Sequence, residues 1–276
     1  MFTDYHVHTD FSCDSTYPME QVLKDAIAMQ MEEICFTDHV DYGVQQDWDS
    51  PHPIKYRENE ALVNVNYPLY VSKIKEFQSK YAGQIKIKMG LEFGVQTHTI
   101  PQYESLFAKY PFDFIILSIH QVNDQEFWTQ EFQEKRSQKE YNEQYYEEML
   151  NVVKMYQNYS VLGHMDLMNR YDIKGIYPFK KVEPLISEIL KVVIENGKGL
   201  ELNTSYHRYG LQDTTPSLDI LKLYRKMGGE IITIGSDSHK PEHLGTYIDE
   251  ARELLKDLGF RFFCTYDKMQ PTYHPL

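Results

Sequence analysis

The segment DYHVHTDFSCDS, at residues 4–15, joins a short β-rich run to a group of polar side chains. His6 and His8 lie two positions apart in that run, and Asp14 follows a few residues later. Because side chains alternate between the two faces of a strand, the two imidazoles are expected to point to the same side. This pattern indicates a functional site at the end of the first strand.

Short apolar runs recur along the rest of the chain. After residues 5–8 they occupy residues 33–37, 85–90, 112–119, 160–163, 199–202 and 231–235. Between them lie segments with helical period, most clearly residues 141–156, 182–195 and 246–258, which place apolar side chains on one stripe. Seven alternating strands and helices predict a parallel sheet buried on both faces. Two arrangements fit this pattern, a doubly wound sheet and a closed barrel.

The chain has 276 residues, a length that suits a single α/β barrel domain. Neither a composition shift nor a Gly/Ser-rich linker divides it, so one domain over residues 1–276 is expected. Residues 41–66 and 121–136 lack periodicity and are expected to be loop insertions. The sequence contains no GxGxxG and no GxxxxGK[ST] motif, and nucleotide-binding versions of the fold therefore have no support.

Composition narrows the range of partners. With 28 Lys and Arg against 41 Asp and Glu, the net charge is -13, which disfavours nucleic acids and anionic membranes. Three cysteines without CxxC spacing predict no disulfide framework and fit a reducing cytoplasm. The N-terminal residues lack the pattern of a secretory signal, and the longest apolar run is too short to cross a membrane. We expect a cytoplasmic protein, and nothing in the sequence indicates its oligomeric state.

Metal-capable side chains recur at or just after the ends of the predicted strands. In parallel α/β folds these ends meet at one edge, where active sites form. We therefore expect nine residues to converge there: His6, His8, Asp14, His39, Glu92, His120, His164, Asp237 and His239.

This donor set predicts metal-dependent hydrolysis. Imidazole and carboxylate ligands without thiolates suit Zn, Mn or Fe(II). Nine ligands exceed what one ion takes, so two to three divalent ions are expected, with at least one carboxylate bridging them. Such clusters hold a hydroxide at neutral pH and suit hydrolysis of phosphate esters. No GxSxG motif supports a serine nucleophile.

With these motifs the chain resembles the PHP (polymerase and histidinol phosphatase) superfamily, and specifically its stand-alone histidinol-phosphatase branch. The resemblance covers essentially the whole sequence. It rests on DYHVHTDFSCDS, FTDH, GLEFG, SIH, GHMD and GSDSH in the family's order, and on the closing FRFFCTYDKMQPTYHPL. It implies a distorted seven-stranded (β/α) TIM-like barrel with three metals at its C-terminal mouth.

The resemblance also implies how the ligands divide. One metal would be held by His6, His8, Glu92 and Asp237, a second by the shared Glu92 with His120 and His164, and a third by Asp14, His39 and His239. The implied reaction is hydrolysis of L-histidinol phosphate, in which a metal-bridging hydroxide attacks phosphorus in line with the ester bond. Glu92, Asp237 and His239 are the expected catalytic residues, and Asp237 or His239 would protonate the leaving alkoxide.

Substrate contacts are expected from two arginines and from acidic or aromatic loop residues. The resemblance implies phosphate contacts at Arg170 and Arg208, whose planar, permanently charged forks suit a phosphate. For the leaving group, Asp41, Tyr42, Asp47 and Tyr206 lie in suitable loops, and the sequence does not select among them. Divalent ions would reverse the sign of an acidic protein locally, where a small phosphate monoester binds.

Three other functions fit parts of the pattern. Another phosphoesterase of the superfamily would act on a nucleotide, a sugar phosphate or phosphotyrosine. A metal-dependent amidohydrolase also combines HxH with histidines and aspartates at strand ends, but it usually bridges its metals with a carbamylated lysine, where this chain has Glu92. Metal storage or sensing would need accessible ligands, whereas these are expected inside a barrel mouth.

Overall fold

Seven parallel strands form a nearly closed barrel in the computed structural model, which describes residues 1–57 and 60–276. Their order is β1 (Thr3–Val7), β2 (Glu33–Phe36), β6 (Lys86–Gly94), β7 (Phe114–Ser118), β10 (Val161–Leu162), β11 (Gly199–Asn203) and β12 (Ile232–Gly235). The segment after β12 returns to β1: the backbone N–H of His8 donates to the Ser238 carbonyl at 2.8 Å, and the Ser238 N–H donates to the His6 carbonyl at 3.1 Å. All seven predicted strands are confirmed, and the barrel is the arrangement that forms.

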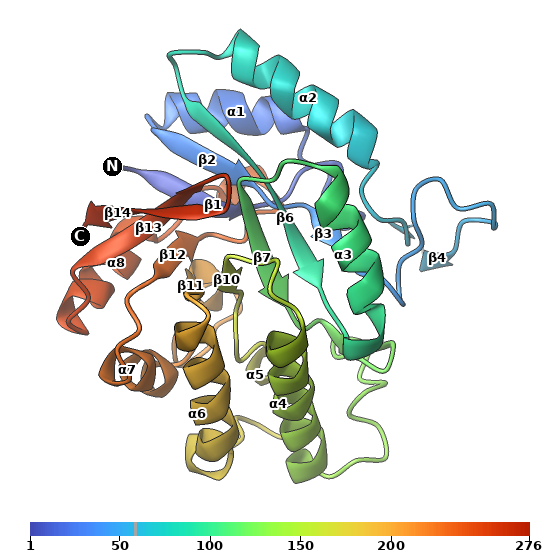
Figure 1. The fold of residues 1–276 in the computed structure, drawn as a ribbon, viewed down its shortest axis with the longest axis vertical. Coiled ribbons are helices and arrows are strands. Elements are labelled where there is room, and N and C mark those ends of the chain that lie inside the picture. Colours follow the sequence, from blue (N-terminus) through green and yellow to red (C-terminus); the bar gives the residue numbers. More distant parts are fainter. Residues whose placement is uncertain (58–59) are drawn as a thin grey trace.

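Helices cover the outside of the strands (Figure 1). They are α1 (Met19–Ala28), α2 (Tyr67–Lys80), α3 (Ile100–Lys109), α4 (Gln138–Met155), α5 (Met168–Tyr171), α6 (Phe179–Glu195), α7 (Leu218–Lys226) and α8 (Ile248–Asp257). Periodicity predicted α4, α6 and α8 to within a few residues at each end. In α6 the apolar stripe is buried, including Val182, Ile186 and Val193. The side-chain hydroxyl of Ser137 and the carboxylate of Glu140 form a capping box that starts α4.

Strand β6 is longer than the sequence pattern suggested. It continues to Gly94, so Glu92 lies within the strand instead of after it. The reason is a short extra strand, β3 (His39–Val40), which pairs with β6 and brings His39 into register with Glu92. Two segments far apart in the sequence therefore deliver polar side chains to the same end of the barrel.

The opposite, N-terminal end of the barrel is closed by a hairpin of β13 (Phe262–Asp267) and β14 (Gln270–Pro275). Tyr266 of this hairpin packs with Tyr5, Phe114 and Val161 in an apolar cluster, and its backbone N–H donates to the Tyr5 hydroxyl at 2.8 Å. Figure 1 shows the two chain termini near each other on this side. The barrel is therefore filled by apolar groups at one end and left with polar groups at the other.

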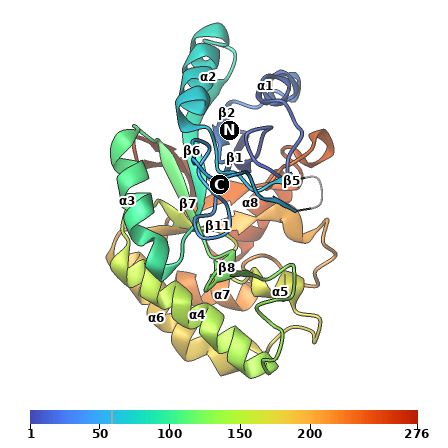
Figure 2. The same cartoon turned by 90° about the vertical axis from the view of Figure 1, so that its right-hand side faces the viewer.

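The two stretches predicted as loops contain small hairpins, β4 (Tyr56–Arg57) with β5 (Glu60–Ala61) and β8 (Gln121–Val122) with β9 (Gln125–Glu126). Residues 58–59 of the first stretch lie outside the described residues. Short 3-10 turns occupy Thr97–Thr99, Thr204–Tyr206 and Pro241–His243. Figure 2 shows α3, α4 and α6 arranged along one side of the molecule. Among the helices within the described residues, none has the length and apolar character needed to cross a membrane.

Candidate metal centre

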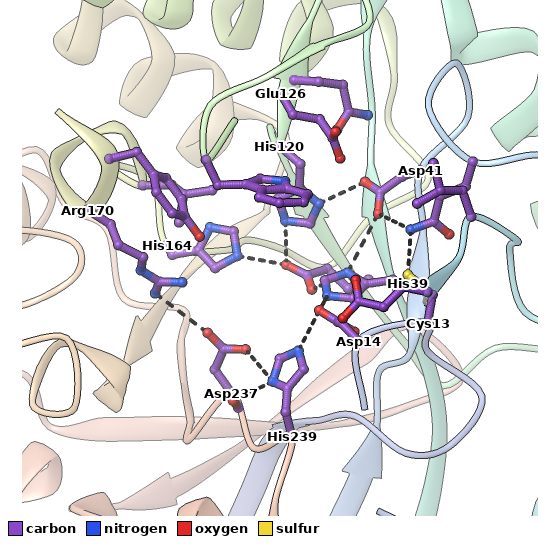
Figure 3. A pocket seen from close by; sticks show the side chains of 18 of the residues that line it. Cys13, Asp14, His39, Asp41, His120, Glu126, His164, Arg170, Asp237 and His239 are labelled. Carbon is purple, nitrogen blue, oxygen red and sulfur yellow. Dashed lines mark hydrogen bonds and ion pairs between the residues drawn. The ribbon is translucent and has the colours of Figure 1, made fainter. Parts of the chain in front are cut away.

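The nine predicted side chains come together at the C-terminal mouth of the barrel. A cavity of about 410 Å³ opens there. Its lining includes Asp14, His39, Glu92, His120, His164, Asp237 and His239. His6, near the end of β1, and His8, directly after it, are fully buried beneath the cavity. Figure 3 shows the labelled side chains from separate loops directed toward one another.

Glu92 is the centre of this group. Five imidazole nitrogens lie around its two carboxylate oxygens, from His6, His8, His39, His120 and His164. The nitrogen–oxygen distances run from 2.7 Å for His164 to 3.4 Å for His8. Burial raises the pKa of Glu92, but His6, His120 and His39 outweigh it and hold the pKa well below its usual range. Glu92 is thus an ionised carboxylate shared by histidines of four separate segments.

Asp237 provides a second buried carboxylate, just after β12. Its Oδ1 atom lies 3.7 Å from Nε2 of His6 and 3.6 Å from Nε2 of His8. Its Oδ2 atom lies 3.6 Å from Nη2 of Arg170 and 3.4 Å from Nη2 of Arg208. Burial raises the pKa of Asp237, and His6, His8 and Arg208 together bring it well below the usual value. One carboxylate thus links the histidine cluster to the arginine side of the cavity.

Asp14 forms the outer part of the centre. Its Oδ2 atom lies 3.4 Å from Nε2 of His39 and 3.2 Å from Nε2 of His239. Figure 3 shows Asp14 and His239 directed toward each other. His39 thus faces two carboxylates, since its Nδ1 atom also lies 3.1 Å from Oε2 of Glu92.

These residues fit divalent metal ions. Nε2 of His8 and Nδ1 of His39 are buried and have no hydrogen-bond partner among the described residues. Nε2 of His8 instead faces oxygens of Glu92 and Asp237. Sets of three donor atoms within 4.8 Å of one another occur at His6–His8–Asp237, His6–Glu92–His164 and His8–His39–His239. Imidazole nitrogens and carboxylate oxygens that converge on one buried point are ligands that suit Zn, Mn or Fe.

Further polar groups hold these histidines from behind, and the sequence reasoning did not identify them. Nδ1 of His6 lies 2.5 Å from Oε1 of Glu201, and Nδ1 of His120 lies 2.8 Å from Oδ1 of Asp41. A carboxylate at one ring nitrogen orients the other nitrogen toward a metal. Glu201 was detectable as the one charged residue of the buried strand GLELN, whereas the contact of Asp41 depends on how its loop turns.

The two predicted arginines lie beside Asp237. The guanidinium of Arg170 donates to the Ser205 hydroxyl at 2.6 Å and stacks on the ring of Tyr209 at 3.9 Å. Nε of Arg170 is buried and has no partner among the described residues. Arg208 donates to the backbone carbonyls of Ser236 at 2.7 Å and Asp237 at 2.5 Å. Arg170 lines the cavity, whereas Arg208 is not among its lining residues and instead braces the segment that carries Asp237.

The cavity wall opposite Arg170, where the leaving group was expected, differs from what the sequence suggested. Of the four leaving-group candidates, only Asp41 lines the cavity. Tyr42 and Asp47 line a separate cavity, where the Tyr42 hydroxyl donates to Asp47, and Tyr206 stacks on His207. The reason is that the loop turns after Asp41 and directs the next side chains outward.

The wall is instead formed by residues that the sequence reasoning missed: Gln45, Arg57, Glu60, Glu126, Trp128, Tyr171 and Tyr209. Glu126 forms a two-point ion pair with Arg57, whose guanidinium lies 4.2 Å from the centre of the Trp128 ring. With Asp41, Glu60 and Glu126 against Arg57, this wall has an excess of negative charge. No local pattern marked these side chains, because several separate segments supply them, including the β4–β5 and β8–β9 hairpins and α5.

A (β/α) barrel with clustered imidazoles and carboxylates at its C-terminal mouth defines a metal-binding hydrolase. The chain belongs to the PHP domain family, whose family model matches residues 4–205, and within it to the histidinol-phosphatases.

Similarity to several known proteins supports the assignment to the histidinol-phosphatases. The sequence is 32% identical over 274 residues to the histidinol-phosphatase of Lactococcus lactis, covering 97% of this chain and 95% of that one. It is 25% identical to the histidinol-phosphatase of Bacillus subtilis, covering 88% and 95%. A crystal structure of the Lactococcus lactis histidinol phosphate phosphatase, complexed with zinc, L-histidinol and phosphate, matches with a TM-score of 0.84 at 31% identity over 98% of both chains.

Proposed function

We propose that this chain hydrolyses L-histidinol phosphate to L-histidinol and phosphate, a reaction of histidine biosynthesis. The observation that carries the proposal is the match, over nearly the whole of both chains, to an enzyme crystallised with zinc and the two products of this reaction. The convergence of acidic, imidazole and guanidinium groups at one cavity supports it independently.

We propose two to three divalent ions, Zn, Mn or Fe, as the cofactors. The ligand groups are His6, His8, Glu92 and Asp237 for one ion, Glu92, His120 and His164 for a second, and Asp14, His39 and His239 for a third. When bound, such ions lower the pKa of coordinated water toward neutrality and neutralise charge on phosphate oxygens. In this assignment Glu92 bridges two ions, which agrees with its position between histidines of both groups.

Arg170 and Arg208 are the proposed phosphate clamp. Their guanidinium groups lie beside Asp237, which lines the cavity with Arg170, and can donate to the non-bridging oxygens as negative charge develops. Of the two candidate general acids, Asp237 already directs one oxygen to the arginines and the other to His6 and His8. His239, on the rim and 18% exposed, would give a proton to the leaving alkoxide only while its Nε2 atom is not bound to the third ion.

The leaving group then faces the acidic and aromatic wall. L-histidinol carries an ammonium group and an imidazole, which favour carboxylates and aromatic rings. Asp41, Glu60 and Glu126 supply the charge, and Trp128 supplies a ring. The phosphate and the cationic leaving group are thus received on opposite sides of one cavity.

We also propose a single domain over residues 1–276 and a cytoplasmic location. The family match ends at residue 205, but β12 lies beyond it and pairs with β11 as the last strand of the barrel. Cys13, Cys35 and Cys264 are free thiols, which suits a reducing compartment.

A panel of phosphomonoesters tests the substrate. We expect L-histidinol phosphate to exceed nucleoside monophosphates, sugar phosphates and phosphotyrosine in kcat/KM by at least about tenfold, the value of one charge-assisted contact. Phosphate release would be measured with Mn, Fe or Zn supplied anaerobically. A higher kcat/KM for any other ester would make that compound the substrate of this cavity.

Replacing Glu126 by glutamine tests the acidic wall. The change removes a negative charge and leaves Arg57 unpaired near the substrate ammonium, so kcat/KM for L-histidinol phosphate is expected to fall about tenfold. For p-nitrophenyl phosphate, which has no cationic group, kcat/KM should stay unchanged. Glu131→Gln, at an exposed position five residues away, is the matched control. Equal losses for both substrates would remove Glu126 from leaving-group recognition.

A further inference from the structure

Glu201 is a buried carboxylate whose role the proposed reaction leaves open. It is the third residue of β11 and is 1% exposed. Within residues 1–57 and 60–276, no lysine or arginine forms an ion pair with it. A buried charge is costly unless other groups satisfy it. The groups that satisfy Glu201 therefore indicate its role.

The two oxygens of Glu201 contact two different segments of the metal centre. Oε1 lies 2.5 Å from Nδ1 of His6, on β1. Oε2 accepts the backbone N–H of His164, after β10, at 3.0 Å. Oε2 also accepts from Nδ2 of Asn203 at 3.2 Å. Since Nδ1 of His6 is engaged, Nε2 is the nitrogen left to face Glu92 and Asp237.

The carboxylate lies in a space that only glycines leave open. A Cβ atom at Gly235 would lie 2.8 Å from Oε1 of Glu201 and 2.3 Å from Cβ of His6. A Cβ atom at Gly163 would lie 3.4 Å from Oε2. The strands on both sides of β11 therefore approach Glu201 closely, and its carboxylate has little room to shift.

From these contacts we infer that Glu201 is a positioning residue that holds His6 and His164, one histidine from each of two neighbouring ligand groups. It fixes the ring of His6 with its proton on Nδ1, and it fixes the backbone from which the His164 ring projects. Asp41 differs, because its contacts with the ligands are to rings alone: Oδ1 lies 2.8 Å from Nδ1 of His120, and Oδ2 lies 3.8 Å from Nδ1 of His39. This inference rests on the proposed metal centre and adds to it a residue that contacts neither ion nor substrate.

Glu201→Gln separates this role from simple packing. Glutamine keeps the shape but turns one oxygen into a donor. If the amide faces His6, the ring must move its proton to Nε2, which then cannot bind a metal. If the amide NH2 faces His164, two hydrogen-bond donors meet, because the backbone N–H of His164 also donates toward this position. Either outcome disturbs a metal ligand, so zinc affinity is expected to fall about 10- to 100-fold.

The matched control is Glu33→Gln. Glu33 is also buried in the barrel, at the start of β2, but it accepts from the Tyr5 hydroxyl at the opposite end. Zinc affinity would be measured by competition with a chromogenic chelator, and Tm with and without zinc. We expect both variants to lower the Tm of the metal-free protein, but only Glu201→Gln to weaken zinc binding and to reduce the Tm increment that zinc adds.

Zinc affinity within threefold of the wild type in Glu201→Gln would overturn the inference, whatever the activity. A wild-type chain that binds no zinc would instead overturn the proposed metal centre, so the two failures are distinguishable. If Glu201→Gln does not fold, nitrogen NMR of the ring of His6 in the wild-type protein decides. A solvent-protected proton on Nδ1 supports the inference, and an Nδ1 that carries no proton contradicts it.

Discussion

Glu92→Gln is expected to lower kcat/KM for L-histidinol phosphate by about 10³-fold or more, which corresponds to about 4 kcal/mol of transition-state stabilisation. The substitution replaces the one carboxylate that faces all five inner histidines. A neutral amide offers one oxygen where the proposed ions need two, and its NH2 group opposes the imidazole nitrogens. The ligand groups around both oxygens are therefore disturbed together.

Metal content and kinetics must change together for this explanation to hold. Metal analysis of the purified variant should show fewer ions per chain than the wild type, with added zinc restoring little activity. Glu33→Gln, the same change at another buried position, should keep both its ions and its kcat/KM within a few fold. A Glu92→Gln enzyme with a full set of ions and near-normal kcat/KM would rule out Glu92 as the bridge.

The barrel and its nine mouth residues could be predicted because both follow from local rules. Apolar runs marked the seven strands, and parallel strands bring their C-terminal ends to one edge. Each of the nine residues lies near such an end, so its place along the chain was enough to predict its place at the mouth. His6 and His8 also followed from the two-residue period of a strand. Glu92 lies inside β6 and not after it, but this difference is along the strand, and the side chain still reaches the mouth.

The cavity wall could not be predicted, because its side chains depend on the path of long loops. Asp41 and Tyr42 are neighbours, yet Asp41 contacts His120 while the Tyr42 hydroxyl bonds with Asp47 and Tyr67. Tyr103 fixes this turn by accepting the backbone N–H of Tyr42 at 3.1 Å. Tyr42 and Tyr103 lie 61 positions apart in the sequence, and no periodic pattern encodes a contact of that kind. Glu126 is likewise brought to the wall by its own hairpin.

Arg170→Ala and Arg208→Ala are each expected to reduce kcat/KM by about 30- to 150-fold, or about 2–3 kcal/mol, the range for a lost charge-assisted contact. Both guanidinium groups lie beside Asp237, where the phosphate is proposed to bind. The effect should appear for p-nitrophenyl phosphate as well as for L-histidinol phosphate, because both carry the same phosphate. This separates the arginines from Glu126, whose loss should depend on the leaving group.

The two arginines should differ when lysine replaces them. Arg208 donates to two backbone carbonyls, of Ser236 and Asp237, and a lysine ammonium cannot match that forked geometry. Arg208→Lys should therefore recover little activity, whereas Arg170→Lys, which gives up a single hydrogen bond, to the Ser205 hydroxyl, should recover more. Arg261→Ala, at an exposed site on the hairpin end of the barrel, serves as the control. Unchanged kcat/KM in both alanine variants would mean that the phosphate binds without either arginine, because no compensating cation among the described residues lines the cavity except Arg57 on the opposite wall.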